Sequence, residues 1–254
     1  MEQNKTRYWN EGIIMKLTKQ TLYRLILEAM EDDPNPRYAK LYDPTRPMAL
    51  YHDDKNTEHS FYLYHLTDDP AFPIFVIAYL AMEVLGDDDK KCIPHTFHVL
   101  GTYTELKARR RGFSRTLYDV AFYNADKFKN KNGDGYGLTS DQYSGTTDVA
   151  DLAAWAKYEQ SKDYYKRETT LGNNKFDYTG KLTPDDKDDD CETYTDKVAT
   201  SHSFQKTSHG DIAQLYFQLL GAHNRFSKEG NLKDMIIKLA SDRFDYYYGQ
   251  ELKK

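Results

Sequence analysis

The alternation of apolar and polar positions along the chain predicts a protein that mixes helices and strands. Apolar residues three or four positions apart predict helices, which are Leu17–Glu31, a helix beginning at Gly112, Asp148–Lys166, Asp211–Phe226 and Leu232–Tyr247. Runs of aromatic and β-branched residues predict strands, which are Ser60–Leu66, Ile74–Met82, Thr96–Glu105 and Tyr136–Thr139. This order of elements predicts a mixed α/β (α+β) fold, in which helices pack on a sheet.

Prolines, glycines and charge runs divide the chain into three predicted parts. Residues 1–47 hold the first helix and a loop with four prolines between Asp32 and Pro47. Residues 48–200 hold the strands and end in an irregular stretch, in which the acidic run Asp185–Glu192 is expected to be a solvated loop. Residues 201–254 are expected to form a helical C-terminal extension.

Composition narrows the class of protein. A chain of 254 residues is long enough to bury a core without staples, and its two cysteines, Cys92 and Cys191, exclude a disulfide scaffold or a four-thiolate zinc site. The net charge of −5 argues against wrapping nucleic acid through bulk charge. No apolar run approaches the roughly 18 residues of a membrane helix, and the first residues carry acidic side chains instead of a signal region. A cytoplasmic protein that does not enter membranes is therefore expected.

The main chemical signal is a basic turn that joins the strand Thr96–Glu105 to the next helix. Four arginines surround the start of this helix, and they are Arg109, Arg110, Arg111 and Arg115. Backbone N–H groups at a helix start are unpaired, and the helix dipole places partial positive charge there. Arginine adds charge-assisted hydrogen bonds, and Gly112 lets an anion approach the backbone closely. The turn therefore predicts a pyrophosphate cradle.

Residues 109–114, which read Arg-Arg-Arg-Gly-Phe-Ser, resemble the acyl-CoA-binding motif of the GCN5-related N-acetyltransferase (GNAT) superfamily. That motif is Arg/Gln-x-x-Gly-x-Gly/Ala, between the fourth strand and the third helix of the family. Ser114 replaces the last small residue of the motif, and Leu106 stands where the family usually has proline. Residues 137–158 look like phage-encoded members, so the resemblance points to a phage-type protein and covers about Phe61 to Tyr165.

The resemblance implies a GNAT-like central mixed, mostly antiparallel sheet flanked by helices. It implies acetyl-CoA as cosubstrate and an amine acceptor on a small molecule or a protein, with no metal. The implied cofactor-binding residues comprise the strand end that would hold the pantetheine arm and the cradle, namely Tyr103, Thr104, Glu105, Arg109, Arg110, Arg111, Gly112, Phe113, Ser114 and Arg115. The aromatic residues of the last two helices could pack on the domain or form a homodimer face.

Catalytic roles follow from the same resemblance. The family's general acid is usually a tyrosine on the helix after the fifth strand, and Tyr158 is the best match. Trp155 is the alternative occupant of that position, and Tyr158 as a plain core aromatic is the other interpretation. The candidate bases are Glu83, in an apolar run, and Glu105, at the end of the next strand.

Two other functions remain open at this point. One is a virion or host-interaction protein that keeps the fold without the chemistry, and the other is a transferase that acts on nucleic-acid bases. Two possible metal motifs are not supported. His95 and His98 are three positions apart on a strand and so face opposite sides, and residues 130–141 resemble a calcium loop but lead into a strand where a helix should follow.

Overall fold

The computed structural model describes residues 36–84, 95–129, 133–140, 155–158, 160–167, 170–171, 174–175, 203–227 and 231–251. The chain divides into two units, Met1–Lys40 and Leu41–Lys254. The described part of the first unit contains the short helix α2 (Pro36–Ala39). The predicted helix Leu17–Glu31 and the acidic run Asp185–Glu192 lie outside the described residues.

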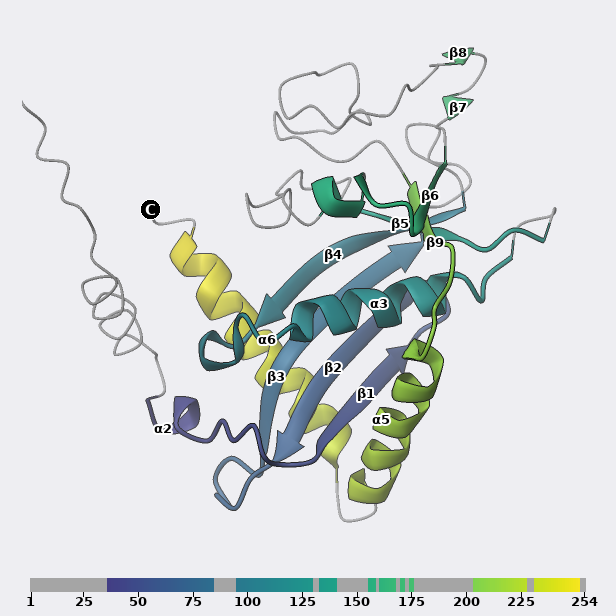
Figure 1. Cartoon of the computed structure of the whole chain (residues 1–254). Coiled ribbons are helices and arrows are strands. Elements are labelled where there is room, and N and C mark those ends of the chain that lie inside the picture. Colours follow the sequence, from purple (N-terminus) through teal and green to yellow (C-terminus); the bar gives the residue numbers. More distant parts are fainter. Residues whose placement is uncertain are drawn as a thin grey trace, which may run out of the picture. The chain divides into compact units, whose positions relative to one another are not determined.

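The second unit is built on a seven-stranded sheet in the order β1-β2-β3-β4-β5-β9-β6 (Figure 1). Its strands are β1 (Met48–Asp54), β2 (Glu58–Leu66), β3 (Ile74–Val84), β4 (Thr96–Thr104), β5 (Gly137–Thr139), β6 (Tyr164–Arg167) and β9 (Ser203–Lys206). Only β4 and β5 are parallel, and the other neighbours are antiparallel. A separate pair consists of β7 (Thr170–Leu171) and β8 (Asn174–Lys175). The predicted mixed, mostly antiparallel sheet is confirmed, and the fold is α+β.

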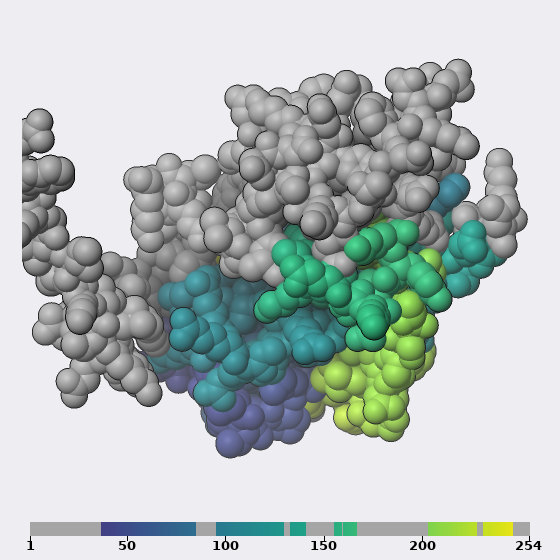
Figure 2. Space-filling view, turned by 45° about the horizontal axis from the view of Figure 1, so that its top comes forward, coloured from purple at the N-terminus to yellow at the C-terminus, as the bar shows by residue number. Residues whose placement is uncertain are grey.

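Three long helices pack on this sheet. The helix α3 (Phe113–Ala125) connects β4 to β5 and crosses one face, while α6 (Leu232–Glu251) crosses the other (Figure 1). The helix α5 (Ile212–Phe226) lies along the edge strand β1, and it also contacts α3 (Figure 2). Because α5 covers β1, this edge of the sheet is shielded from pairing with another chain.

The two faces of β1–β3 bury separate sets of side chains because successive residues of a strand point to opposite sides. On the α6 face the cluster consists of Ala49, Tyr51, Tyr62, Tyr64, Ile74 and Val76 from the strands with Ala222, Leu232, Ile236 and Ala240 from the helices. The alternate strand residues lie under α3, and Leu50, Phe61, Leu63 and Phe75 are all at most 2% exposed. Both faces are therefore core, which explains why the strands read as nearly continuous apolar runs.

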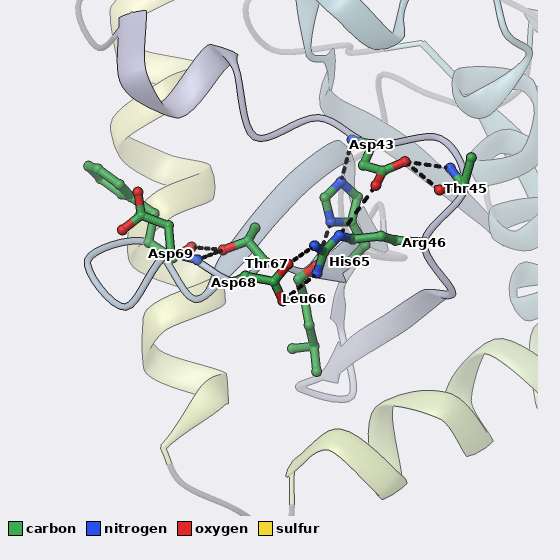
Figure 3. Close-up of polar contacts among 9 residues, drawn as sticks. Asp43, Thr45, Arg46, His65, Leu66, Thr67, Asp68 and Asp69 are labelled. Atoms are coloured by element: carbon green, nitrogen blue, oxygen red, sulfur yellow. Dashed lines mark hydrogen bonds and ion pairs between the residues drawn. The ribbon is translucent and has the colours of Figure 1, made fainter.

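A polar network fixes the chain before β1 to the end of β2 (Figure 3). The Asp43 N–H donates to Nε2 of His65 at 3.2 Å. Arg46 donates to the Leu66 carbonyl at 3.2 Å and forms an ion pair with Asp68. Burial lowers the pKa of His65, so its ring is neutral and Nε2 is able to accept this bond. The network holds β1 in register at the point where it enters the sheet.

Most predicted elements are confirmed, while the structure adds one strand and corrects two of the predictions. The helix from Gly112 and the two C-terminal helices are present as α3, α5 and α6. The strand β1 was not predicted, because its run is short and is buried on both faces without a clear alternation. The predicted helix Asp148–Lys166 is helical at residues 155–158, but Tyr164–Arg167 forms β6. Residues 201–254 are not only helical, since Ser203–Lys206 forms β9 inside the sheet.

None of the helices in the described residues has both the length and the apolar composition needed to cross a bilayer.

Candidate functional site

The candidate site is the turn between β4 and α3, together with the first turn of α3. A short 3₁₀ helix, η1 (Leu106–Ala108), follows β4, and Gly112 then occupies the N-cap position of α3. The φ of Gly112 is 86°, a left-handed conformation that favours glycine. A Cβ placed on Gly112 would meet no heavy atom within 4 Å. The backbone is therefore accessible at the point where a phosphate would approach.

The start of α3 presents unpaired backbone donors. Among the described residues no side chain caps this end of the helix, and the hydrogen bond from the Thr116 N–H to the Gly112 carbonyl, at 2.9 Å, closes its first turn. Within the described residues, the N–H groups of Phe113, Ser114 and Arg115 consequently have no acceptor. Together with the helix dipole, these donors favour an anion at this position.

Exposed arginines surround these donors, and they are Arg109, Arg110, Arg111 and Arg115. The Arg109 Nε donates to the Thr104 carbonyl at 3.2 Å, and the Arg111 guanidinium lies 5.4 Å from the centre of the Tyr42 ring. Among the side chains that the structure describes, no carboxylate forms an ion pair with any of the four. Their charge is thus available to a polyanionic ligand.

Ser114 departs from the small residue of the acyl-CoA motif, and the structure gives its side chain a role. Its hydroxyl lies 2.7 Å from the Thr104 hydroxyl, so the first turn of α3 is tied to the last residue of β4. This contact uses only the side chain. The Ser114 N–H stays directed out of the helix start, as the cradle requires.

The outer edge of β4 leads from this cradle toward the middle of the sheet. β5 pairs with β4 only over Thr96–His98, so beyond His98 the β4 ladder is with β3 alone among the described strands, with a register shift at Leu100. The Glu105 N–H donates to the Ile77 carbonyl of β3 at 2.9 Å. By strand alternation, the backbone of Tyr103 also faces β3, while Thr102 and Thr104 face the other edge. Of the three residues expected to hold pantetheine, Thr104 alone has its backbone on this edge.

Glu105 is buried and bound to α6. Its carboxylate receives Arg243 in a bidentate pair, with Nη2–Oε1 at 2.8 Å and Nε–Oε2 at 3.1 Å. The Tyr103 hydroxyl donates to Oε2 at 2.5 Å. These charge-assisted hydrogen bonds tie the end of β4 to α6. The geometry gives Glu105 the role of anchoring the end of β4, and its role as base stays a prediction.

Glu83 occupies a different part of the sheet. It is opposite His98 in the β3–β4 ladder, and its carboxylate lies 3.6 Å from His98 Nε2. Thr104 is six positions after His98 on β4, which corresponds to about 20 Å along the strand. The Glu83 side chain is 43% exposed, so it retains access to solvent next to the place where β4 and β5 separate. Its role as base stays a prediction.

Tyr158 and Trp155 belong to an aromatic cluster between α3 and the β9–β6 part of the sheet. The Tyr158 ring lies 4.8 Å from the ring of Tyr164 and 5.4 Å from that of Phe122. Trp155 is 1% exposed and stacks on Phe204 at 5.7 Å. These contacts are those of a core aromatic, as the alternative interpretation expected. The general-acid role of Tyr158 stays a prediction.

The structure also brings together three residues that the sequence analysis missed, namely His52, Asp54 and His59. His52 and Asp54 are two positions apart on β1 and so point to the same face of the sheet. His59 is opposite Asp54 on β2. A hairpin prediction for residues 48–66 would have placed the three side chains on one face. That prediction needed β1, which the apolar pattern did not reveal.

Comparison with known proteins gives no assignment for this fold or for either group of residues. The chain matches no family model, no curated protein and no solved structure. The function proposed for the chain therefore depends on its own geometry and on the motif resemblance.

Proposed function

We propose that this chain binds an acyl-CoA thioester at the start of α3 and transfers the acyl group to an amine. The proposal is carried by the helix start at Gly112, whose first N–H groups have no acceptor among the described residues and which four exposed arginines surround. A pyrophosphate presents several charged oxygens in a small volume, and this arrangement of donors and guanidinium groups is complementary to it.

The outer edge of β4 supports the second half of the ligand. Pantetheine is an extended chain with two amides, and an extended chain can pair with an exposed strand edge through main-chain hydrogen bonds. The β4 residues that face this edge, Thr102 and Thr104, lie next to the cradle. A pantetheine arm leaving the cradle along β4 would carry the thioester toward His98, where β5 joins the sheet.

The proposed reaction is direct acyl transfer. The nitrogen of a neutral amine attacks the thioester carbonyl, the new C–N bond forms, and the C–S bond breaks. The amine loses one proton to a base, for which Glu83 and Glu105 are the candidates, and the departing thiolate gains one proton. Tyr158 is proposed as the donor, on the strength of its position in the helix after β5.

Binding of CoA tests the cradle directly. Gly112→Glu places an anion where the phosphates should bind, and we expect acetyl-CoA affinity measured by calorimetry to fall at least tenfold. Gly133→Glu is the matched control, because Gly133 has φ 84° and an equally open Cβ position but lies in the turn before β5. Equal affinity in wild type and Gly112→Glu would show that this turn does not bind the cofactor.

Acyl transfer needs a separate measurement. Incubation of the full chain with acetyl-CoA and a panel of primary amines should release CoA thiol only when an acceptor is present. Tyr158→Phe keeps the ring in its aromatic cluster, so a loss of at least about a hundredfold in rate with unchanged acetyl-CoA affinity would identify the proton donor. Tight CoA binding without thiol release would favour the non-catalytic alternative with the same fold.

A further inference from the structure

A second group of side chains lies at the other end of α3, on the β1–β2 hairpin. His52 Nε2 is 3.0 Å from His59 Nδ1, and the Asp54 carboxylate oxygen is 3.6 Å from the same His59 nitrogen. The three donor atoms all lie within 4.8 Å of one another. A tetrahedral zinc ion with bonds of about 2.0–2.1 Å holds neighbouring ligand atoms roughly 3.3 Å apart. The spacing of the three atoms is close to that of a zinc ligand set.

The ring of His52 is oriented by a partner on its far side. Its Nδ1 lies 2.7 Å from the Tyr216 hydroxyl of α5. A hydrogen bond from Nδ1–H to an oxygen fixes the tautomer that leaves the lone pair on Nε2, and metal-binding histidines commonly have such a partner. Tyr216 therefore directs Nε2 of His52 toward His59.

The ring of His59 is held by apolar packing instead. It lies edge-on to Phe97 and to Phe128, each with a centroid distance of 5.3 Å. Its Nε2 is buried and has no hydrogen-bond partner among the described residues. The orientation of His59 is thus set by the core, and Nδ1 is the nitrogen that points to His52 and Asp54.

A metal needs one lone pair from each ring. The proton now shared between His52 Nε2 and His59 Nδ1, which are 3.0 Å apart, would move to an outer ring nitrogen when a metal binds, so each ring keeps one proton and none is released.

We propose that His52, Asp54 and His59 bind one divalent transition-metal ion of the zinc class. Two neutral imidazoles and one carboxylate form a three-ligand set that leaves a fourth position for water. The ion would enter from the side of Asp54, which is exposed, while His59 is buried at the base of the site. The site does not depend on the proposed acyl-CoA function, since it shares no residue with the cradle.

The positive charge of Lys127 opposes the binding of a cation at this site. Lys127 acts electrostatically on both histidines, and its ammonium group lies 4.3 Å from the Tyr123 ring centre and 4.6 Å from that of Tyr216. It also donates to the Asn124 side-chain carbonyl at 2.9 Å. Asp54 offsets the charge of Lys127, which makes the carboxylate essential to metal binding.

Zinc titration of the full chain tests the site. Calorimetry should show one Zn²⁺ per chain, and Co²⁺ should give the intense visible absorption of a tetrahedral site. Asp54→Asn removes an exposed charge and should preserve the fold while weakening Zn²⁺ binding at least tenfold. His52→Asn should abolish the Co²⁺ spectrum.

His209→Asn is the matched control, because His209 lies 3.6 Å from the Asp126 carboxylate and no second histidine of the described residues joins that pair. This variant should bind Zn²⁺ as the wild type does. The proposal is overturned if the wild type takes up no stoichiometric Zn²⁺. It is equally overturned if Asp54→Asn, confirmed as folded by circular dichroism, binds Zn²⁺ with unchanged affinity.

Discussion

The two ends of α3 present opposite kinds of chemistry on one helix. At its start, four solvated arginines and unpaired N–H groups surround Gly112. Beyond its end, Phe128 and Lys127 lie next to a histidine pair in which His59 is buried and His52 is half-buried. The first end would recognise a ligand by permanent charge, and the second by the lone pairs of desolvated nitrogen atoms.

The difference follows from where each end lies relative to water. Exposed guanidinium groups keep their hydration, so four of them gather at little cost, and a ligand must bring the opposite charge. Burial at the other end disfavours the charged form of each imidazole, which is why the pKa of His52 falls to about 4. A metal ion suits such nitrogens because it needs them neutral.

The largest expected effect concerns the buried ion pair between Glu105 and Arg243. Arg243→Met should destabilise the protein by about 3–5 kcal/mol, because the buried carboxylate of Glu105 would lose its bidentate ion pair. Urea denaturation measures this change in the free energy of unfolding. Lys238→Met is the matched control on the same helix, since its pair with Asp242 is exposed. A loss as small as that of the control would show that the start of α3 does not depend on a buried anchor.

The start of α3 could be predicted because its signal is contiguous in sequence. Strand, turn, arginines and helix follow one another from Thr96 to Ala125, so local rules for helix starts were sufficient. The Glu105–Arg243 pair could not be predicted in the same way, because 138 residues separate the partners. Nothing in the local pattern around Arg243 indicates that the arginine turns inward.

The end of α3 was missed for a related reason. His52, Asp54 and His59 come together only through the pairing of β1 with β2, and Tyr216 joins them from α5. The run that forms β1 lacks alternation because side chains on both of its faces are buried. Single-strand patterns do not reveal a site that depends on strand register.

Loss of the hydroxyl that orients His52 is expected to have the next largest effect. Tyr216→Phe should weaken Zn²⁺ binding about 10–100-fold, because nothing would then fix the tautomer of His52. Zinc calorimetry on the folded variant provides the measurement. Tyr123→Phe is the control, as its ring lies 5.6 Å from Tyr216 and has no described bond to either histidine. Equal weakening by both variants would assign the effect to ring packing.

Ionic strength should separate the two ends without any mutation. Raising salt from about 0.05 to 0.5 M shortens the Debye length from above 10 Å to below 5 Å, so acetyl-CoA affinity at the exposed arginines should fall roughly tenfold. Zn²⁺ affinity at the histidine pair should change much less, because the bonds there are short and partly buried. If salt weakened acetyl-CoA binding and Zn²⁺ binding equally, charge attraction rather than coordination would explain the metal binding.

The smallest expected effect has the opposite sign. Lys127→Met keeps most of the side chain's length but removes the ammonium that faces His52, His59 and Asp54, so Zn²⁺ should bind about threefold to tenfold more tightly. Lys129→Met is the control, because Lys129 is exposed and pairs with Asp126 at 3.4 Å. A gain restricted to Lys127→Met would place the metal beside this ammonium. An unchanged or reduced Zn²⁺ affinity in a folded Lys127→Met variant would mean that the ion binds elsewhere on the chain. Removing a neighbouring positive charge cannot weaken the binding of a cation at these three ligands. Circular dichroism of the same sample shows whether the variant is folded.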